Sequence, residues 1–251
     1  MKKLLLIVLL IGATLQESQA KIQAGVGIKV GPAFGRWNNE FQKRGQANAG
    51  GTLGFKTGLH AGLQGRIWFN KFIGINLAAE FNMSGNTFKG TKGTIITTAT
   101  HKENQLTIPV TAMAGWGNER MRLFANVGGF FGYNISGTNN TEVNNSGSET
   151  STGFVKTDYK NDLQSIDAGL RLGAGLQIYV DKKLRSCVTF DINYDYGFIK
   201  VHRNTPPDYF MKPETLKLTN SKLMIGVGFI YSFGKNQAEE KPNRPVPVIE
   251  E

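Results

Sequence analysis

Residues 166–178 read Ile-Asp-Ala-Gly-Leu-Arg-Leu-Gly-Ala-Gly-Leu-Gln-Ile, with an apolar side chain at every even position and a polar residue or glycine at every odd one. Successive side chains of a β-strand point to opposite faces of the sheet. The alternation therefore predicts a strand that separates an apolar medium from a polar one.

Seven further segments show the same alternation. The eight predicted strands are residues 22–30, 55–69, 72–83, 106–116, 121–133, 166–178, 188–196 and 223–233. Short turns at residues 70–71, 117–120 and 181–183 alternate with long polar loops at residues 32–54, 84–103, 136–162 and around Pro206 and Pro207. Outer-membrane barrels have this pattern of short periplasmic turns and long extracellular loops. We predict an all-β fold, an eight-stranded antiparallel up-and-down transmembrane β-barrel.

The apolar faces of these segments carry almost no charge, as contact with lipid requires. A water-soluble barrel would place its charges outside and its apolar side chains inside. Aromatic residues are expected to form two interfacial girdles on the lipid face. The first consists of Phe69, Trp116, Tyr231 and Phe233 near the short turns, and the second of Phe81, Tyr133, Tyr194, Tyr196 and Phe198 near the long loops.

The two ends of the chain differ from its middle. Residues 1–20 resemble a cleaved signal peptide, with Lys2 and Lys3 before an apolar stretch and a Ser18-Gln19-Ala20 cleavage site. The barrel is expected over residues 21–233, and residues 234–251 form a Pro-rich, charged tail predicted to be a disordered periplasmic segment. A mean hydropathy of −0.25 argues against a helical membrane bundle. We expect an outer-membrane location in a Gram-negative cell.

The polar face of the predicted strands holds a set of charges that would fill the lumen. Its cations outnumber its anions seven to four: Lys29, Lys56, Arg66, Arg122, Arg171, Arg185 and Lys222 against Glu80, Asp167, Asp191 and Asp195. An eight-stranded lumen is narrow enough for side chains to fill it, which favours a salt-bridge network that plugs the bore. Arg171 should pair with Asp191 or Asp195 on the neighbouring strand. The alternative is a weakly anion-preferring channel for small solutes.

Enzymatic chemistry has little support in the sequence. Asp191 and Asp195 lie four residues apart on a strand, about 13–14 Å along its axis, too far to act on one bond. His60, His101 and His202 have no partners spaced as in a zinc site or a nucleophilic triad. A site at the rim that uses His202 with Asp195 or Asp208 is the remaining enzymatic alternative. We expect no cofactor and no metal, and no nucleic-acid binding, because the aromatic residues face lipid.

Two local expectations test the strand assignment. Pro109 lies in mid-strand and lacks a backbone donor, so it should cause a bulge or a lost ladder bond. The alternation in residues 166–178 also predicts that Gly169, on the lumen face, tolerates serine, whereas arginine at the neighbouring lipid-facing Leu170 blocks insertion.

Four stretches resemble the PorT-type outer-membrane β-barrel family of Bacteroidetes. They are Gln-Leu-Thr-Ile-Pro-Val (105–110), Asn-Val-Gly-Gly-Phe-Phe-Gly-Tyr (126–133), residues 167–176, and Gly-Val-Gly-Phe-Ile-Tyr-Ser-Phe (226–233). The resemblance implies a porin-family barrel inserted by the outer-membrane assembly machinery, in a family with some links to secretion. We therefore expect a monomeric, non-enzymatic barrel in outer-membrane lipid that contacts a protein partner through its loops or tail.

Overall fold

The structure is a computed structural model of the chain, and it describes residues 22–38, 52–92, 95–118, 120–145, 152–158, 160, 163–200 and 219–233. The predicted signal peptide and the predicted tail lie outside these residues. None of the described residues forms a helix long and apolar enough to cross a membrane.

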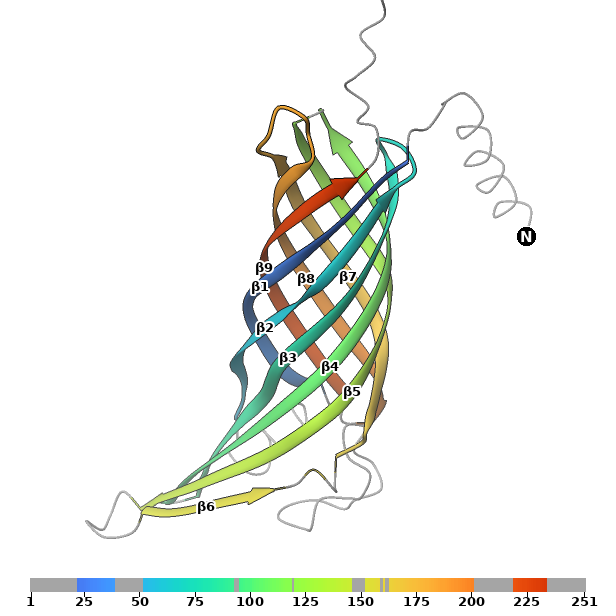
Figure 1. The fold of residues 1–251 in the computed structure, drawn as a ribbon. Helices are drawn as coiled ribbons and strands as arrows, with labels where there is room; N and C mark the ends of the chain where they lie inside the picture. Colours follow the sequence, from blue (N-terminus) through green and yellow to red (C-terminus); the bar gives the residue numbers. More distant parts are fainter. Residues whose placement is uncertain are drawn as a thin grey trace, which may run out of the picture.

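The described residues form nine antiparallel strands (Figure 1). Their bounds are β1 Gln23–Asn38, β2 Thr52–Trp68, β3 Ile73–Lys92, β4 Ile95–Gly117, β5 Met121–Asn145, β6 Thr152–Asp158, β7 Ile166–Tyr179, β8 Ser186–Lys200 and β9 Thr219–Phe233. Eight of them close a ring in the order β1-β2-β3-β4-β5-β7-β8-β9, and β9 pairs back onto β1. The predicted eight-stranded up-and-down barrel is confirmed, and β6 is an additional strand that pairs only with β5.

The two faces of each barrel strand separate as the alternation predicts. On β7, Leu170 and Leu172 point outward and are 47% and 52% exposed, whereas Asp167 and Arg171 point inward and are buried. The residues of both expected aromatic girdles are exposed on the outer surface, except Phe69, which is half-buried. The barrel is thus apolar outside and polar inside, as a membrane barrel requires.

Each of the three short turns contains an Asn or Asp side chain that accepts hydrogen bonds from backbone amides that follow it in the chain. Asn70 Oδ1 accepts from the amides of Phe72 and Ile73 at 2.8 and 2.7 Å. Asn118 and Asp181 do the same in the other two turns. These hydrogen bonds between a side chain and the nearby backbone fix the reversal of the chain locally, so the sequence alone suffices to place the turns.

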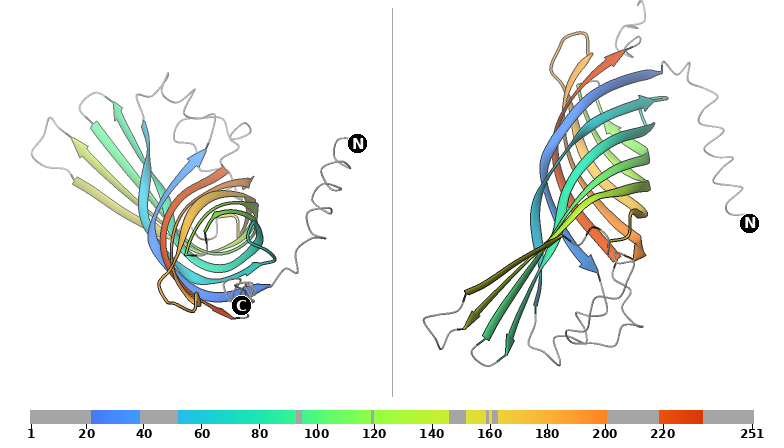
Figure 2. Two further views of the ribbon diagram at one scale, coloured as in Figure 1. Left: turned by 90° about the horizontal axis from the view of Figure 1, so that it is seen from above. Right: turned by 60° about the horizontal axis from the view of Figure 1, so that its bottom comes forward.

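The long loops are shorter than predicted, because β3, β4 and β5 continue well past the barrel. Residues 84–92 pair with 95–103, residues 95–104 pair with 136–145, and β6 pairs with the outer end of β5. These segments form a sheet that projects from one side of the barrel mouth, here called the arm (Figures 1 and 2). The expectation of loops was wrong for residues 84–92, 95–103, 136–145 and 152–158, and the remaining residues of the two predicted loops lie largely outside the described ranges. Strands with water on both faces show no apolar-polar alternation, while their threonines still favour strands.

The arm leaves the barrel where the strand pairing is irregular. The register between β2 and β3 shifts between Phe55 and His60, and the register between β4 and β5 shifts at Asn104 and Gln105. On β3, between these two shifts, Gly85 has a φ of +145°, a backbone conformation that favours glycine. Bulges bend and twist a sheet locally, which accounts for the outward flare of the arm in Figure 2.

Pro109 interrupts the ladder without a bulge. The β3–β4 pairing passes from Leu77↔Val110 to Glu80↔Thr107 in unchanged register, with the two pairs between them missing. On the other side Pro109 pairs with Phe130 in step. The lost ladder bond expected at this residue is therefore confirmed.

Glycines on the inner face lie close against side chains and backbone of nearby strands. A Cβ on Gly228 would lie 2.7 Å from both Gln64 Nε2 and Thr189 Oγ1. A Cβ on Gly169 would lie 2.0 Å from the carbonyl oxygen of Tyr196, which is backbone and cannot move aside. This contact argues against the prediction that Gly169 tolerates serine, because a position that faces the lumen does not necessarily have free space.

Candidate functional site

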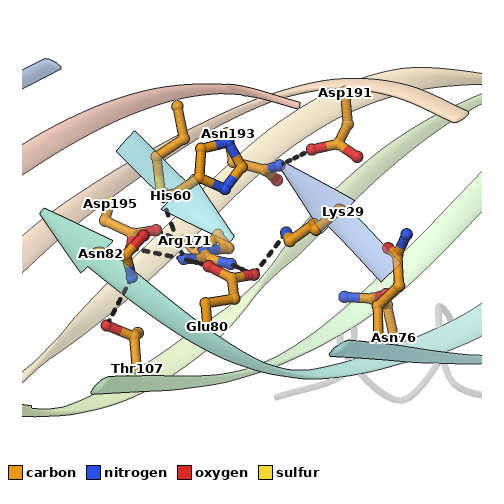
Figure 3. Close-up of polar contacts among 12 residues, drawn as sticks. Lys29, His60, Asn76, Glu80, Asn82, Thr107, Arg171, Asp191, Asn193 and Asp195 are labelled. Atoms are coloured by element: carbon orange, nitrogen blue, oxygen red, sulfur yellow. Dashed lines mark hydrogen bonds and ion pairs between the residues drawn. The ribbon is translucent and has the colours of Figure 1, made fainter. Parts of the chain in front are cut away.

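The lumen is the place where most of the predicted site residues meet, and its centre is a charge network that crosses the bore. Arg171 on β7 donates from Nε and Nη2 to Asp195 on the adjacent β8 at 2.5 and 2.7 Å. It also donates from Nη1 and Nη2 to Glu80 on β3, three strands away around the ring, at 2.7 and 2.9 Å. Lys29 on β1 contacts the same Glu80 carboxylate at 2.5 Å (Figure 3). The middle of the bore is therefore bridged by two carboxylates and two cations, all buried.

The end of the lumen near the short turns is closed by two arginine–aromatic pairs. The guanidinium of Arg66 on β2 lies 4.5 Å from the ring centre of Phe124 on β5, and that of Arg122 on β5 lies 4.4 Å from Trp68 on β2. Because β2 and β5 stand three strands apart around the ring, these side chains reach across the bore. Trp68 and Phe124 also pack together with Met113, so this layer is apolar as well as cationic. Cation–π contacts of this desolvated kind stabilise by about 2 kcal/mol each.

Beside the arginine–aromatic layer, Asp191 receives a hydrogen bond from Asn193 at 2.6 Å and lies 3.7 Å from Arg66. His60 is fully buried in the bore, and its Nε2 lies 3.1 Å from the carbonyl oxygen of Ile225. The imidazole thus serves the packing of the bore wall (Figure 3).

The outer end of the lumen holds a third layer centred on Gln105. Lys222 donates to Gln105 Oε1, and Gln105 Nε2 donates to Asn134 at 3.0 Å and to Asp167 at 3.2 Å. Glu103 lies beside this group and accepts from Asn220 Nδ2 at 3.4 Å. A small pocket at the barrel mouth opens onto this layer, and Glu103, Asn134, Asp167 and Asn220 are among its lining residues.

The structure changes the predicted balance of lumen charges. Arg185 is exposed in the turn before β8, so its assignment to the lumen was wrong. The alternation of β8 does not continue back to residue 185, because Leu184, at a φ of 54°, is the buried residue of this turn. Lys56 lies on the inner face but is only half-buried. Glu103, which was assigned to a loop, is buried because β4 extends to it.

With these corrections, the buried charges of the described residues are balanced. They are Lys29, Arg66, Arg122, Arg171 and Lys222 against Glu80, Glu103, Asp167, Asp191 and Asp195. The excess of cations that suggested an anion-preferring channel is therefore absent from the buried lumen.

The structure does not support Asp195 as the acid of the alternative enzymatic site at the rim. Asp195 is buried in the centre of the bore and bonded to Arg171, far from any rim. His202 and Asp208 lie outside the described residues. Within the described ranges, no group of three or more His, Cys, Asp or Glu side chains is arranged to hold a metal ion.

Comparison with known proteins identifies the family. The sequence model of the outer membrane protein beta-barrel domain family matches residues 16–203. The chain belongs to this family. It is accordingly an integral outer-membrane β-barrel protein, and its apolar outer surface lies in the membrane. The match is to this general family, so the narrower resemblance to the PorT-type family stays a prediction.

Several solved outer-membrane β-barrels are similar to this one at low identity. OprG of Pseudomonas aeruginosa is 14% identical over 87% of this chain and 98% of its own, with a TM-score of 0.43. Neisserial surface protein A is 13% identical over 83% and 97%, with a TM-score of 0.40. Ail, the attachment invasion locus protein of Yersinia pestis, is 15% identical over 83% and 99%, with a TM-score of 0.35. No curated protein matches the chain.

Proposed function

We propose that this outer-membrane β-barrel is a non-enzymatic scaffold with a closed bore, which holds its arm outside the cell for contact with a protein partner. The central observation is the Glu80–Arg171–Asp195 bridge across the bore. The Arg66–Phe124 and Arg122–Trp68 layer spans the bore at a second level, and an eight-stranded lumen is narrow enough for side chains to fill it.

The length of the arm supports a role outside the membrane. A transmembrane strand needs only about 9–11 residues, whereas β4 and β5 contain 23 and 25. Ile95 at the tip is 11 residues beyond Leu106, a lipid-facing residue of the same strand, which corresponds to about 36 Å of extended chain.

The tip of the arm carries apolar side chains where lipid no longer explains them. Ile95 and Val143 are 43% and 36% exposed, and the pairing of β4 with β5 places them diagonally on one face of the arm. Ile96, 39% exposed, lies at the same tip on the other face. Exposed β-branched residues at a sheet tip are suited to burial against a protein surface. The resemblance to the PorT-type family extends the proposal to a partner in protein secretion.

Photo-crosslinking in intact cells tests the contact. A photoreactive amino acid at Ile96 should give a crosslink to one protein, whereas the same group at Leu172, on the lipid face, should not. The variant Ile96→Asp should lose the partner, and Thr98→Asp, on the same strand and face, serves as the matched control. Equal crosslinking at positions 96 and 172 would refute the proposed contact.

Single-channel recording tests the closed bore independently. The purified protein in planar bilayers should show no steady conductance. The double variant Trp68→Ala and Phe124→Ala removes the aromatic part of the inner layer and should raise the frequency of openings. Steady openings of the wild type would favour the alternative, a channel for small solutes.

A further inference from the structure

The outer layer of the lumen differs from the other two in the sign of its charge. It contains the carboxylates of Glu103 and Asp167 and one buried cation, Lys222. The central layer pairs Glu80 and Asp195 with Lys29 and Arg171. The outer layer therefore carries one carboxylate more than its buried cations, at the end of the bore that faces the outside.

The hydrogen bonds of this layer engage Asp167 Oδ2 and leave Asp167 Oδ1 without a partner among the described residues. Lys222 fixes Gln105 through Oε1, and Gln105 in turn donates from Nε2 to Asp167 Oδ2 at 3.2 Å. Asp167 Oδ1 has no hydrogen-bond partner among the described residues, although the side chain is only 5% exposed. A buried carboxylate oxygen without a partner is unfavourable by several kcal/mol unless another group satisfies it.

Asn220 on β9 presents a second oxygen of the same kind. Its Nδ2 donates to Glu103 Oε2 at 3.4 Å, which orients the amide. Its Oδ1 finds no hydrogen-bond partner in the described part of the chain, and the side chain is 4% exposed. Glu103, Asp167 and Asn220 line the same pocket at the barrel mouth.

We propose that this pocket binds one divalent cation, Ca²⁺ in preference to Mg²⁺, through oxygens of Glu103, Asp167 and Asn220. Carboxylate and amide oxygens are the ligands that hard divalent cations prefer, and Ca²⁺ accepts an irregular set of them. Oxygens from three separate strands, β4, β7 and β9, suit this looser geometry better than the strict octahedron of Mg²⁺. A bound cation would tie these three strands together at the mouth.

The composition of the pocket sets the expected affinity. Two carboxylates are few for a calcium site, and the exposed Lys200 stands at the pocket's edge. We expect a dissociation constant of about 0.1–1 mM, the range of extracellular calcium modules. A site of this strength is filled only where the cation is abundant, as it is outside a cell.

Calorimetric titration of the folded, detergent-solubilised protein with CaCl₂ at constant ionic strength tests the site. Wild type should bind one Ca²⁺, and MgCl₂ should bind more weakly. Asp167→Asn and Asn220→Ala should each weaken Ca²⁺ binding about tenfold or more. Glu142→Gln, which removes an exposed carboxylate from the arm outside the pocket, is the matched control and should bind as wild type does. The folded state of every variant is checked by heat-modifiable gel mobility.

Three results would overturn the assignment. The first is Ca²⁺ binding in Asn220→Ala as tight as in wild type, which decides the matter even if Asp167→Asn does not fold. The second is the same heat from NaCl as from CaCl₂, which would show only ionic screening. The third comes from Lys200→Gln, because removal of a nearby cation should tighten Ca²⁺ binding; weaker binding would mean that the pocket takes an anion at Lys200.

Discussion

Replacement of Arg171 with alanine should destabilise the barrel by about 3–5 kcal/mol, the range for removal of one partner from a buried ion pair. Arg171 makes four hydrogen bonds of 2.5–2.9 Å to Glu80 and Asp195. After its removal Glu80 still has Lys29 at 2.5 Å. Asp195 has an ion pair with Arg171 only, within the described part of the chain, so it is the carboxylate left without compensation.

This asymmetry makes the prediction specific to one second-site change. Adding Asp195→Asn to Arg171→Ala removes the uncompensated charge and should recover about 0.5–3 kcal/mol. Adding Lys29→Ala instead should worsen the loss, because Glu80 would then lose its remaining cation. The two double variants should therefore move in opposite directions from the single variant.

Urea unfolding of the protein in detergent measures these differences, with heat-modifiable gel mobility as the readout of the folded barrel. Lys182→Ala removes an exposed charge from the β7–β8 turn and is the control, expected to change stability by less than about 0.5 kcal/mol. If Arg171→Ala unfolds like Lys182→Ala, the network does not hold the barrel together. If it also gains conductance, the charges regulate a pore and the closed scaffold is refuted.

Three further predictions concern the walls and the ends of the barrel. Leu172→Arg, at the middle of the lipid face of β7, should lower stability by about 2–4 kcal/mol and the yield of folded band, while Leu172→Ala should still fold. Gly169→Ser should reduce folding on the same gel, since its Cβ would meet the Tyr196 carbonyl at 2.0 Å; a wild-type folded fraction would show that the wall has room to relax. An epitope inserted after Asn145 should bind antibody on intact cells and one after Glu251 should not, because an even number of strands returns the chain to its starting side; surface labelling at residue 251 would contradict the eight-strand ring.

Much of the candidate site could be predicted from neighbouring strands. The sequence places Arg171 and Asp195 on the same inner face of consecutive strands, and the structure pairs them directly. Glu80 could not be assigned as the second partner, because β3 is separated from β7 by two other strands and only closure of the ring brings them together. Trp68 and Phe124 were not recognised as a layer for the same reason, although both lie at inward positions in the alternation.

The sequence by itself determined which residues face lipid and which face the lumen, because two media of different polarity impose a period of two on every barrel strand. It also determined the three short turns, which Asn70, Asn118 and Asp181 close locally. Only the tertiary structure decided how far β3, β4 and β5 continue, because water on both faces of the arm removes the alternation. Only closure of the ring decided which charges meet across the bore, since contacts between opposite walls leave no periodic signal in the chain.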